Sequence, residues 1–250
     1  FWDRKRTAER MVSINMREAL FRVMETTKKR PESKCYIAGH SMGGLIIGKT
    51  IAPSITTLLL SSGKQGIRLP ADLVLLLNPA LDGLSSWEFI DFLKRSGAHV
   101  KLRALDGTMR DAPGPIIASI TSEADTATGA LYTAGQAVGT LNTKFRNDYP
   151  NSMPSQKYLA THAEGHIEYL ISHRAWLEDG KVKLERIPNA YNDTPYWVIQ
   201  TTADIIKDHI DIRNPKLDEL LNQISELNEL YSTEVQTWMF TNFEQDQGEQ

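Results

Sequence analysis

The segment 39–43, GHSMG, constrains the fold of this 250-residue chain more than any other feature. It follows a short apolar run and matches the pattern G-x-S-x-G, which is typical of a sharp turn between a strand and a helix. Such a turn lifts a serine hydroxyl, here that of Ser41, above the edge of a sheet. Because strand and helix approach closely there, side chains at Gly39, Gly43 or Gly44 are expected to collide with their neighbours.

A serine is a weak nucleophile near neutral pH, so Ser41 implies chemistry only if a histidine base and a carboxylate lie elsewhere in the chain. Asp125 follows the apolar segment 115–121, which is predicted to be a buried strand. His209 follows the segment 196–201, which is predicted to be the last strand. Both residues are thus expected at the carboxyl edge of a parallel sheet, where open α/β folds have their sites.

With this motif and this order of residues, the chain resembles the α/β-hydrolase superfamily, from the helix before Ser41 to the helix after His209. The form Gly-His-Ser-Met-Gly-Gly is common among the esterases and lipases of that superfamily. The resemblance implies Ser41 as the nucleophile, Asp125 as the acid that orients the base, and His209 as the base. It also implies that the backbone N–H of Met42 is one donor of the oxyanion hole.

The activity that the resemblance implies is hydrolysis of a carboxylic ester, a small-molecule substrate, through an acyl-enzyme. This chemistry needs no metal and no organic cofactor. Asp82, which follows the apolar segment 72–77, is the alternative for the acid. A module of the same fold that binds without catalysis is the rival from a different class of protein. The reactivity of Ser41 distinguishes the two.

A second motif overlaps the first. Residues 43–50, GGLIIGKT, satisfy the phosphate-binding pattern G-x-x-x-x-G-K-[ST], which makes a nucleotide-binding protein a less favoured alternative. The two interpretations exclude each other, because a helix over this segment carries Lys49 and leaves no anion cradle. A phosphate loop also calls for an aspartate after a later strand to hold magnesium, whereas the segment 73–77 ends in Asn78-Pro79.

Three other histidines have weaker signals. His162 and His166 are four residues apart, a spacing at which two side chains share one helix face and can bind zinc. Their order does not fit H-E-x-x-H, and Gly165 weakens a helix here, so we interpret the pair as a surface cluster and predict no metal site. His40, beside the nucleophile, is expected to pack or hydrogen-bond near the mouth of the site.

Composition limits the partners of the chain. The net charge is −3 and the pI is near 6.1, so the sequence offers no basic field to hold nucleic acid. No apolar run reaches eighteen residues, so no transmembrane segment is predicted. The single cysteine, Cys35, cannot form an internal disulfide, and its position in the strand before Ser41 indicates a buried thiol.

The alternation of predicted strands and helices favours an α/β fold, with a mostly parallel sheet and helices on both faces. Helical spacing predicts a first helix over about 7–29 and another after the turn, which Pro53 is expected to break or restart. A capping box at 85–88 opens a further helix that Gly97 closes. The last helix is expected over about 215–231.

Residues 1–140 and 191–243 are expected to form the hydrolase-like core, and residues 244–250 a disordered tail. The connection between Asp125 and His209 is longer than a connection that contains a single helix. Residues 141–190 are therefore expected to include an insertion, which we interpret as a cap over the pocket. The alternative is an ordinary extra helical layer.

The segment before Ser41 is short for this superfamily, in which four strands usually precede the strand that leads to the nucleophile. One of those connections normally supplies the second oxyanion donor. We therefore expect this chain to be the C-terminal part of a longer protein, with the strand before Ser41 at an unpaired edge of the sheet.

Overall fold

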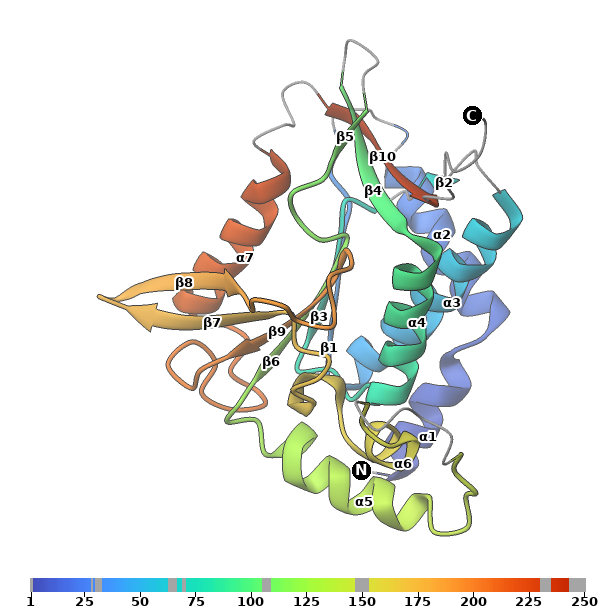
Figure 1. The fold of residues 1–250 in the computed structure, drawn as a ribbon, viewed down its shortest axis with the longest axis vertical. Coiled ribbons are helices and arrows are strands. Elements are labelled where there is room, and N and C mark those ends of the chain that lie inside the picture. The colour runs from blue at the N-terminus through green and yellow to red at the C-terminus, as the bar shows by residue number, and fades with distance from the viewer. Residues whose placement is uncertain are drawn as a thin grey trace.

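The computed structural model describes residues 2–27, 29, 33–62, 67–68, 71–104, 109–146, 153–229 and 235–242. These residues form an α/β fold in which helices pack against a six-stranded, mostly parallel sheet (Figure 1). The fold class predicted from the sequence is therefore confirmed.

The main sheet has the strand order β1-β3-β6-β9-β7-β8. In chain order its strands are β1 (Tyr36–His40), β3 (Leu73–Leu77), β6 (Ile117–Ser122), β7 (His173–Glu178), β8 (Lys181–Arg186) and β9 (Tyr196–Thr201). All are parallel except β8, which returns antiparallel to β7 in a hairpin. Because parallel strands have their carboxyl ends together, the residues that follow β1, β3, β6 and β9 meet at one edge.

The central strands are buried on both faces, which explains their almost continuous apolar sequences. All five residues of β3 and all six of β6 are buried. Since successive side chains of a strand point to opposite faces, Val74 and Leu76 join the core on one side of the sheet, and Leu73 and Leu75 join the core on the other.

Helices cover both of these faces. On one side lie α3 (Met42–Ser62) and α4 (Gly83–Ser96), and on the other α7 (Pro215–Glu229) packs through Leu217, Leu220 and Ile224. The remaining helices of the described part are α1 (Trp2–Met11), α2 (Ile14–Thr27), α5 (Tyr132–Gly139) and α6 (Gln156–Thr161). Figure 1 shows α5 and α6 near the carboxyl ends of the parallel strands.

The single helix predicted over about 7–29 is wrong, because two helices, α1 and α2, occupy this region. The break falls beside Ser13, whose Oγ accepts a hydrogen bond from the N–H of Met16 at 3.3 Å. This bond satisfies one of the N–H groups that a helix start leaves without an internal partner, so Ser13 begins a new helix.

Pro53 lies inside α3, and the predicted interruption there is absent. Leu45, Ile51, Ile55 and Leu59 are buried on both sides of the proline. Packing along the whole helix therefore offsets the cost of an interior proline, which is about 3 kcal/mol or more.

By length and composition, α3 is apolar enough to cross a membrane, with a mean hydropathy of 1.4 over the best window. Half of that window is buried inside the protein. Because α3 packs on the sheet and follows the turn at Ser41, we interpret it as a core helix of the α/β fold.

The capping box predicted at 85–88 is not the start of α4, which begins at Gly83. Asp82 is the N-cap, and its Oδ1 accepts hydrogen bonds from the N–H and the Oγ of Ser85 at 2.9 and 2.8 Å. The predicted end of this helix is confirmed, since Gly97 has a φ of 58° and caps it in the left-handed conformation.

A second sheet, with strand order β2-β10-β4-β5, pairs its strands antiparallel. Its strands are β2 (Ile67–Arg68), β4 (Ala98–Ala104), β5 (Met109–Asp111) and β10 (Val235–Asn242). The segment 196–201 is a strand as predicted, but it is not the last one, because β10 follows it. The predicted tail, 244–250, lies outside the described residues.

The segment 141–190 contributes β7 and β8 to the main sheet, so this part continues the sheet rather than leaving it. α6 and the short 3-10 turn Glu164–His166 come before these strands. The division into a core and a cap stays a prediction.

His173, at the start of β7, is buried and stacks on Trp197 of β9 with 3.8 Å between ring centroids. Burial, with a smaller effect from the charge of Arg186, lowers the pKa of His173 to about 4 from its ordinary value of 6.5. At a pH between 4 and 6.5, His173 is therefore protonated in the unfolded chain and neutral in the folded chain. The stability that a neutral His173 confers is therefore lost as the pH falls from 6.5 towards 4.

We expect the free energy of unfolding of the wild type to fall by about 2 kcal/mol more between pH 7 and pH 5 than that of His173→Gln, which has no titrating ring. Urea unfolding at the two pH values measures the difference. An equal pH dependence in the two proteins would contradict a buried, neutral His173.

Candidate active site

Ser41 lies in the turn between β1 and α3, at the carboxyl edge of the main sheet. Its φ is 54°, in the left-handed region that is uncommon for residues other than glycine. The Ser41 N–H donates to the carbonyl oxygen of Leu77, and the N–H of Ala80 donates to the carbonyl oxygen of Ser41, both at 3.0 Å. The strained turn that the motif predicts is thus present, and the end of β3 holds it.

Two glycines near Ser41 are required by close contacts. A Cβ added at Gly39 would lie 2.7 Å from backbone atoms of Gly43, and one at Gly44 would lie 2.8 Å from the Cβ of Pro79. The collision predicted at Gly43 is wrong, because a Cβ built there has no atom within 4 Å apart from its chain neighbours and the backbone of its own helix. The carbonyl group of Gly43 lies close to Gly39, but a side chain at Gly43 would point into open space.

The structure brings Ser41, Asp125 and His209 together. Ser41 Oγ is 2.8 Å from His209 Nε2, and His209 Nδ1 is 2.8 Å from Asp125 Oδ2. Because a carboxylate only accepts hydrogen bonds, Nδ1 carries a hydrogen and donates a hydrogen bond to Asp125. Nε2 then accepts the hydrogen bond from the Ser41 hydroxyl. A general base needs this arrangement to remove a proton from serine.

Asp125 is fully buried and accepts four hydrogen bonds. Its Oδ1 accepts from the N–H groups of Ala127 at 2.9 Å and Thr128 at 3.1 Å, and its Oδ2 accepts from Thr128 Oγ1 at 2.6 Å as well as from His209. Burial would raise the pKa of the Asp125 carboxyl, but the hydrogen bonds from His209 and Thr128 outweigh it and hold this pKa below its ordinary value. The carboxyl is therefore a buried anion beside His209.

Thr128 connects Asp125 to a second histidine. His166 Nε2 is 3.0 Å from Thr128 Oγ1. Since the Thr128 hydroxyl donates its hydrogen to Asp125, the Nε2–H of His166 must be the donor in this contact. Burial lowers the pKa of His166, although the charge of Asp125 opposes the shift. The prediction of a surface cluster is wrong for His166, which lies half-buried behind the acid.

His162 and His166 do not share a helix face, because α6 ends at Thr161 and His166 belongs to the following 3-10 turn. His162 Nδ1 instead lies 2.9 Å from the carbonyl oxygen of Tyr158. Within the described ranges, no three His, Cys, Asp or Glu side chains are grouped so as to hold a metal ion.

Asn78 and His40 fix the loop that carries His209. Asn78 is buried with a φ of 40°, and its Nδ2 donates to the carbonyl oxygens of Asp208 and His209 at 3.4 and 3.2 Å. Its Oδ1 accepts from the N–H of Ser122 at 3.0 Å. His40 Nε2 donates to the same His209 carbonyl oxygen at 2.7 Å, which confirms the hydrogen bond predicted for it near the mouth.

Sequence reasoning missed Asn78, Thr128 and His166. Asparagine directly after an apolar strand is a usable signal, because it tolerates positive φ better than most residues. Thr128 also follows an aspartate by three residues, a spacing typical of local capping. Nothing in the sequence points to the contact of Thr128 with His166.

Met42 is the first residue of α3. The first N–H groups of a helix lack partners within it, and the helix dipole favours negative charge at this end. The Met42 N–H is thus at the N-terminus of α3, next to Ser41. Its role as an oxyanion donor stays a prediction.

Asp82, the alternative acid, has other partners. Its Oδ2 is 2.9 Å from Lys49 Nζ, while its Oδ1 caps α4 through Ser85. Burial would raise the pKa of Asp82, but Lys49 and Ser85 hold it below its ordinary value.

The segment 43–50 is helical within α3, so the loop required for phosphate binding is not formed there.

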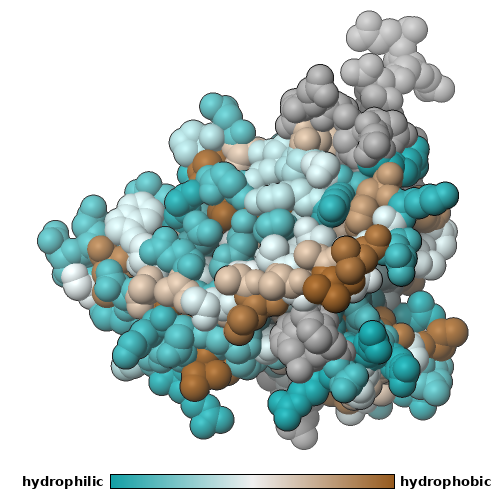
Figure 2. Space-filling view, turned by 90° about the horizontal axis from the view of Figure 1, so that it is seen from below, coloured by the Kyte–Doolittle hydropathy of each residue, from teal (hydrophilic) through white to brown (hydrophobic). Residues whose placement is uncertain are grey.

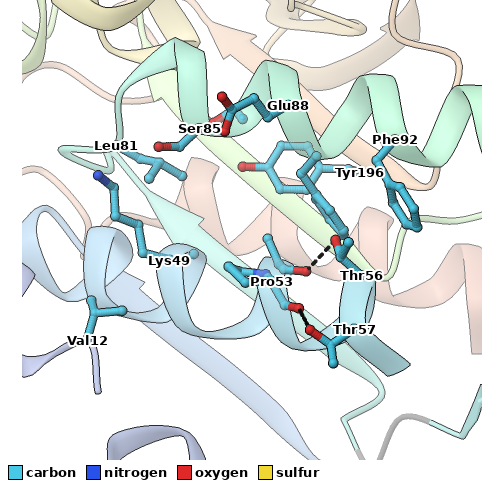
Figure 3. Close-up of a pocket in the computed structure, with 14 residues that line it drawn as sticks. Val12, Lys49, Pro53, Thr56, Thr57, Leu81, Ser85, Glu88, Phe92 and Tyr196 are labelled. Carbon is cyan, nitrogen blue, oxygen red and sulfur yellow. Dashed lines mark hydrogen bonds between the residues drawn. The ribbon is translucent and has the colours of Figure 1, made fainter. Parts of the chain in front are cut away.

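A cavity of about 470 Å³ lies between α3 and α4 (Figure 3). Pro53 and Thr56 of α3 face Phe92 of α4 across it, and Tyr196 of β9 lies between the helices. Lys49, at one end, already forms its ion pair with the N-cap of α4. The residues that line this cavity include none of the three that meet at the carboxyl edge of the sheet.

Comparisons with protein-family models, with curated proteins and with solved structures find no match for this chain. An α/β fold alone does not define a function, because many activities share such folds. The geometry around Ser41, Asp125 and His209 is therefore the basis for a functional assignment.

We expect Gly39→Ala to lower the free energy of unfolding by about 1–3 kcal/mol, because the added Cβ meets backbone that can move only if the turn shifts. Thermal unfolding measures this loss. Gly43→Ala is the matched control and should be neutral or slightly stabilising, since it adds a methyl group to a helix in open space. Equal losses in both variants would contradict the steric account.

Proposed function

We propose that this chain is a serine hydrolase of the α/β-hydrolase type that cleaves carboxylic esters through an acyl-enzyme. The observation that carries the proposal is the hydrogen-bonded series Ser41–His209–Asp125, with both contacts at 2.8 Å. The positive φ of Ser41 between a strand and a helix supports it, as does the order of serine, acid and histidine along the chain. Binding alone does not call for this combination.

In the proposed reaction, the Ser41 hydroxyl oxygen attacks the ester carbonyl while His209 Nε2 takes its proton. The Asp125 anion stabilises the imidazolium that forms, and the Met42 N–H donates to the developing oxyanion. The alcohol leaves with the proton from His209, and the acyl group stays on Ser41. Water, deprotonated by the same histidine, then attacks the acyl carbon. The bond to Ser41 Oγ breaks, His209 returns the proton to that oxygen, and the carboxylic acid leaves.

These steps use only side chains, one backbone N–H and water, so the proposal includes no metal and no organic cofactor. Its partner is a small-molecule ester. Thr128 and His166 have positioning roles in this proposal: the Thr128 hydroxyl supplies one of the four donors to Asp125, and His166 orients that hydroxyl.

A fluorophosphonate, which bonds covalently to an activated serine, should add one label to the wild type and none to Ser41→Ala. His209→Ala removes the base, and Asp125→Asn removes the anion beside it. Both should label slower by about 10³-fold or more. Intact-mass spectrometry measures the rates, and circular dichroism establishes that each variant folds.

Ser85→Ala is the control for this experiment, because it removes a serine hydroxyl at the N-terminus of α4 and should keep the wild-type rate. A folded wild type without a label, or a label that persists in Ser41→Ala, would contradict the proposal. The first of these results would favour a hydrolase-fold module that only binds.

Thr128→Val should slow labelling by about 10- to 100-fold, because it removes one hydrogen bond to a charged group at nearly constant volume. Thr128→Ser keeps the hydroxyl and should restore a rate near that of the wild type. Thr126→Val changes an exposed threonine of the same loop and serves as the control. Equal rates for Thr128→Val and the wild type would exclude a positioning role for Thr128.

A further inference from the structure

The outer face of α5 is apolar, although the helix lies on the surface. The π-helical turn Ala127–Leu131 leads into α5, and Leu131 and Val138, seven residues apart, share one face. These side chains are 65% and 69% exposed, and that of Leu141, just beyond the helix, is 78% exposed. The exposed residues between 127 and 139 are Ala130, Leu131, Ala134, Ala137, Val138 and Gly139.

The polar groups of this helix point inward instead. The hydroxyl oxygen of buried Tyr132 accepts hydrogen bonds from Lys5 Nζ at 3.2 Å and from Gln136 Nε2 at 3.0 Å. Gln136 also donates to the carbonyl oxygen of Ala160 in α6 at 3.5 Å. A surface helix normally turns its apolar stripe toward the core. The Tyr132 ring also packs in an apolar cluster with Ala8 and Leu45. These inward contacts fix α5 on the protein and leave Leu131 and Val138 in water as a second apolar face.

Charge is unevenly distributed around this face. The segment 126–143 contains no charged residue, although 24% of the chain is charged. The described residues 126–146 and 153–163 include no Asp or Glu, while Lys144, Arg146 and Lys157 are exposed. The hollow between α5 and α1 has both signs of charge, so the excess of cations lies on the side of α6. Tyr158, also exposed on α6, adds an aromatic ring to this side.

We propose that the face formed by Leu131, Val138, Leu141 and the exposed side of α6 binds a lipid surface that carries anionic headgroups. Aliphatic side chains free of carboxylates can enter the boundary of the acyl region. Tyrosine is favoured at headgroup level, and lysine and arginine attract anionic lipids. Figure 2, which views this end of the molecule, shows hydrophobic residues in a band across its centre.

A second copy of the chain fits this face less well, because a two-fold contact would bring the exposed cations of both copies together. A lipid surface also relates the face to the candidate site. The segment begins directly after Asp125, and Ile210, which follows His209, is 76% exposed at the same edge of the sheet. A lipid surface bound here would lie beside Ser41.

Co-sedimentation with vesicles of phosphatidylcholine and phosphatidylserine tests the proposal, with Ser41→Ala as the parent protein so that binding is measured apart from any hydrolysis. We expect the parent to sediment with these vesicles. The double substitution Leu131→Ser and Val138→Ser should weaken binding by about 10-fold or more. Lys144→Gln and Lys157→Gln should each weaken it by about 5-fold. High salt, or vesicles of phosphatidylcholine alone, should also weaken binding.

Val23→Ser with Leu60→Ser is the matched control, because these aliphatic side chains are equally exposed on α2 and α3, and binding should not change. The proposal would be overturned if the parent protein stayed in the supernatant. It would also be overturned if the control lost as much vesicle binding as the double substitution at Leu131 and Val138. Sedimentation velocity adds a further test. A dimer that the double substitution at Leu131 and Val138 abolishes, without vesicle binding, would assign the face to a second copy.

Discussion

Parallel pairing of β1, β3, β6 and β9 is the constraint on which the rest of the structure depends. It brings four strand ends to one edge of the sheet, although their residues are far apart in sequence. Ser41 and His209 are 168 positions apart, yet their side chains share a hydrogen bond. The pairing is stable because the strands are apolar on both faces and helices cover each face. The apolar core on both faces of the sheet thus fixes the positions of the polar residues at this edge.

The parts of the fold that follow from local sequence were predictable. Apolar strands and the glycine-rich turn have patterns of a few residues, so the strand at 196–201 and the conformation at Ser41 agree with the sequence. The positions of Asp125 and His209 beyond strand ends follow from the same patterns. The catalytic roles of these residues are still predictions. Local rules failed where packing outweighed them, as along α3, which continues through Pro53.

The surroundings of the candidate site could not be predicted, because they depend on contacts between distant segments. Asn78 bonds to a loop about 130 positions away, and His166 reaches Thr128 across 38 positions. No periodicity or short motif encodes such pairs. Each buried polar group needs a partner, but the sequence does not say which of many candidates the fold supplies. The hydrogen-bond partners of single polar residues near strand ends are therefore the feature that the sequence predicts least well.

The carbonyl oxygen of His209 accepts hydrogen bonds from both His40 and Asn78, so both of its lone pairs are used. Rotation of this peptide plane would break two hydrogen bonds at once, both of them partly buried. The backbone that carries the imidazole is therefore held by hydrogen bonds from two other segments of the chain. In the proposed reaction, little of the barrier would then come from reorganising the loop that carries His209.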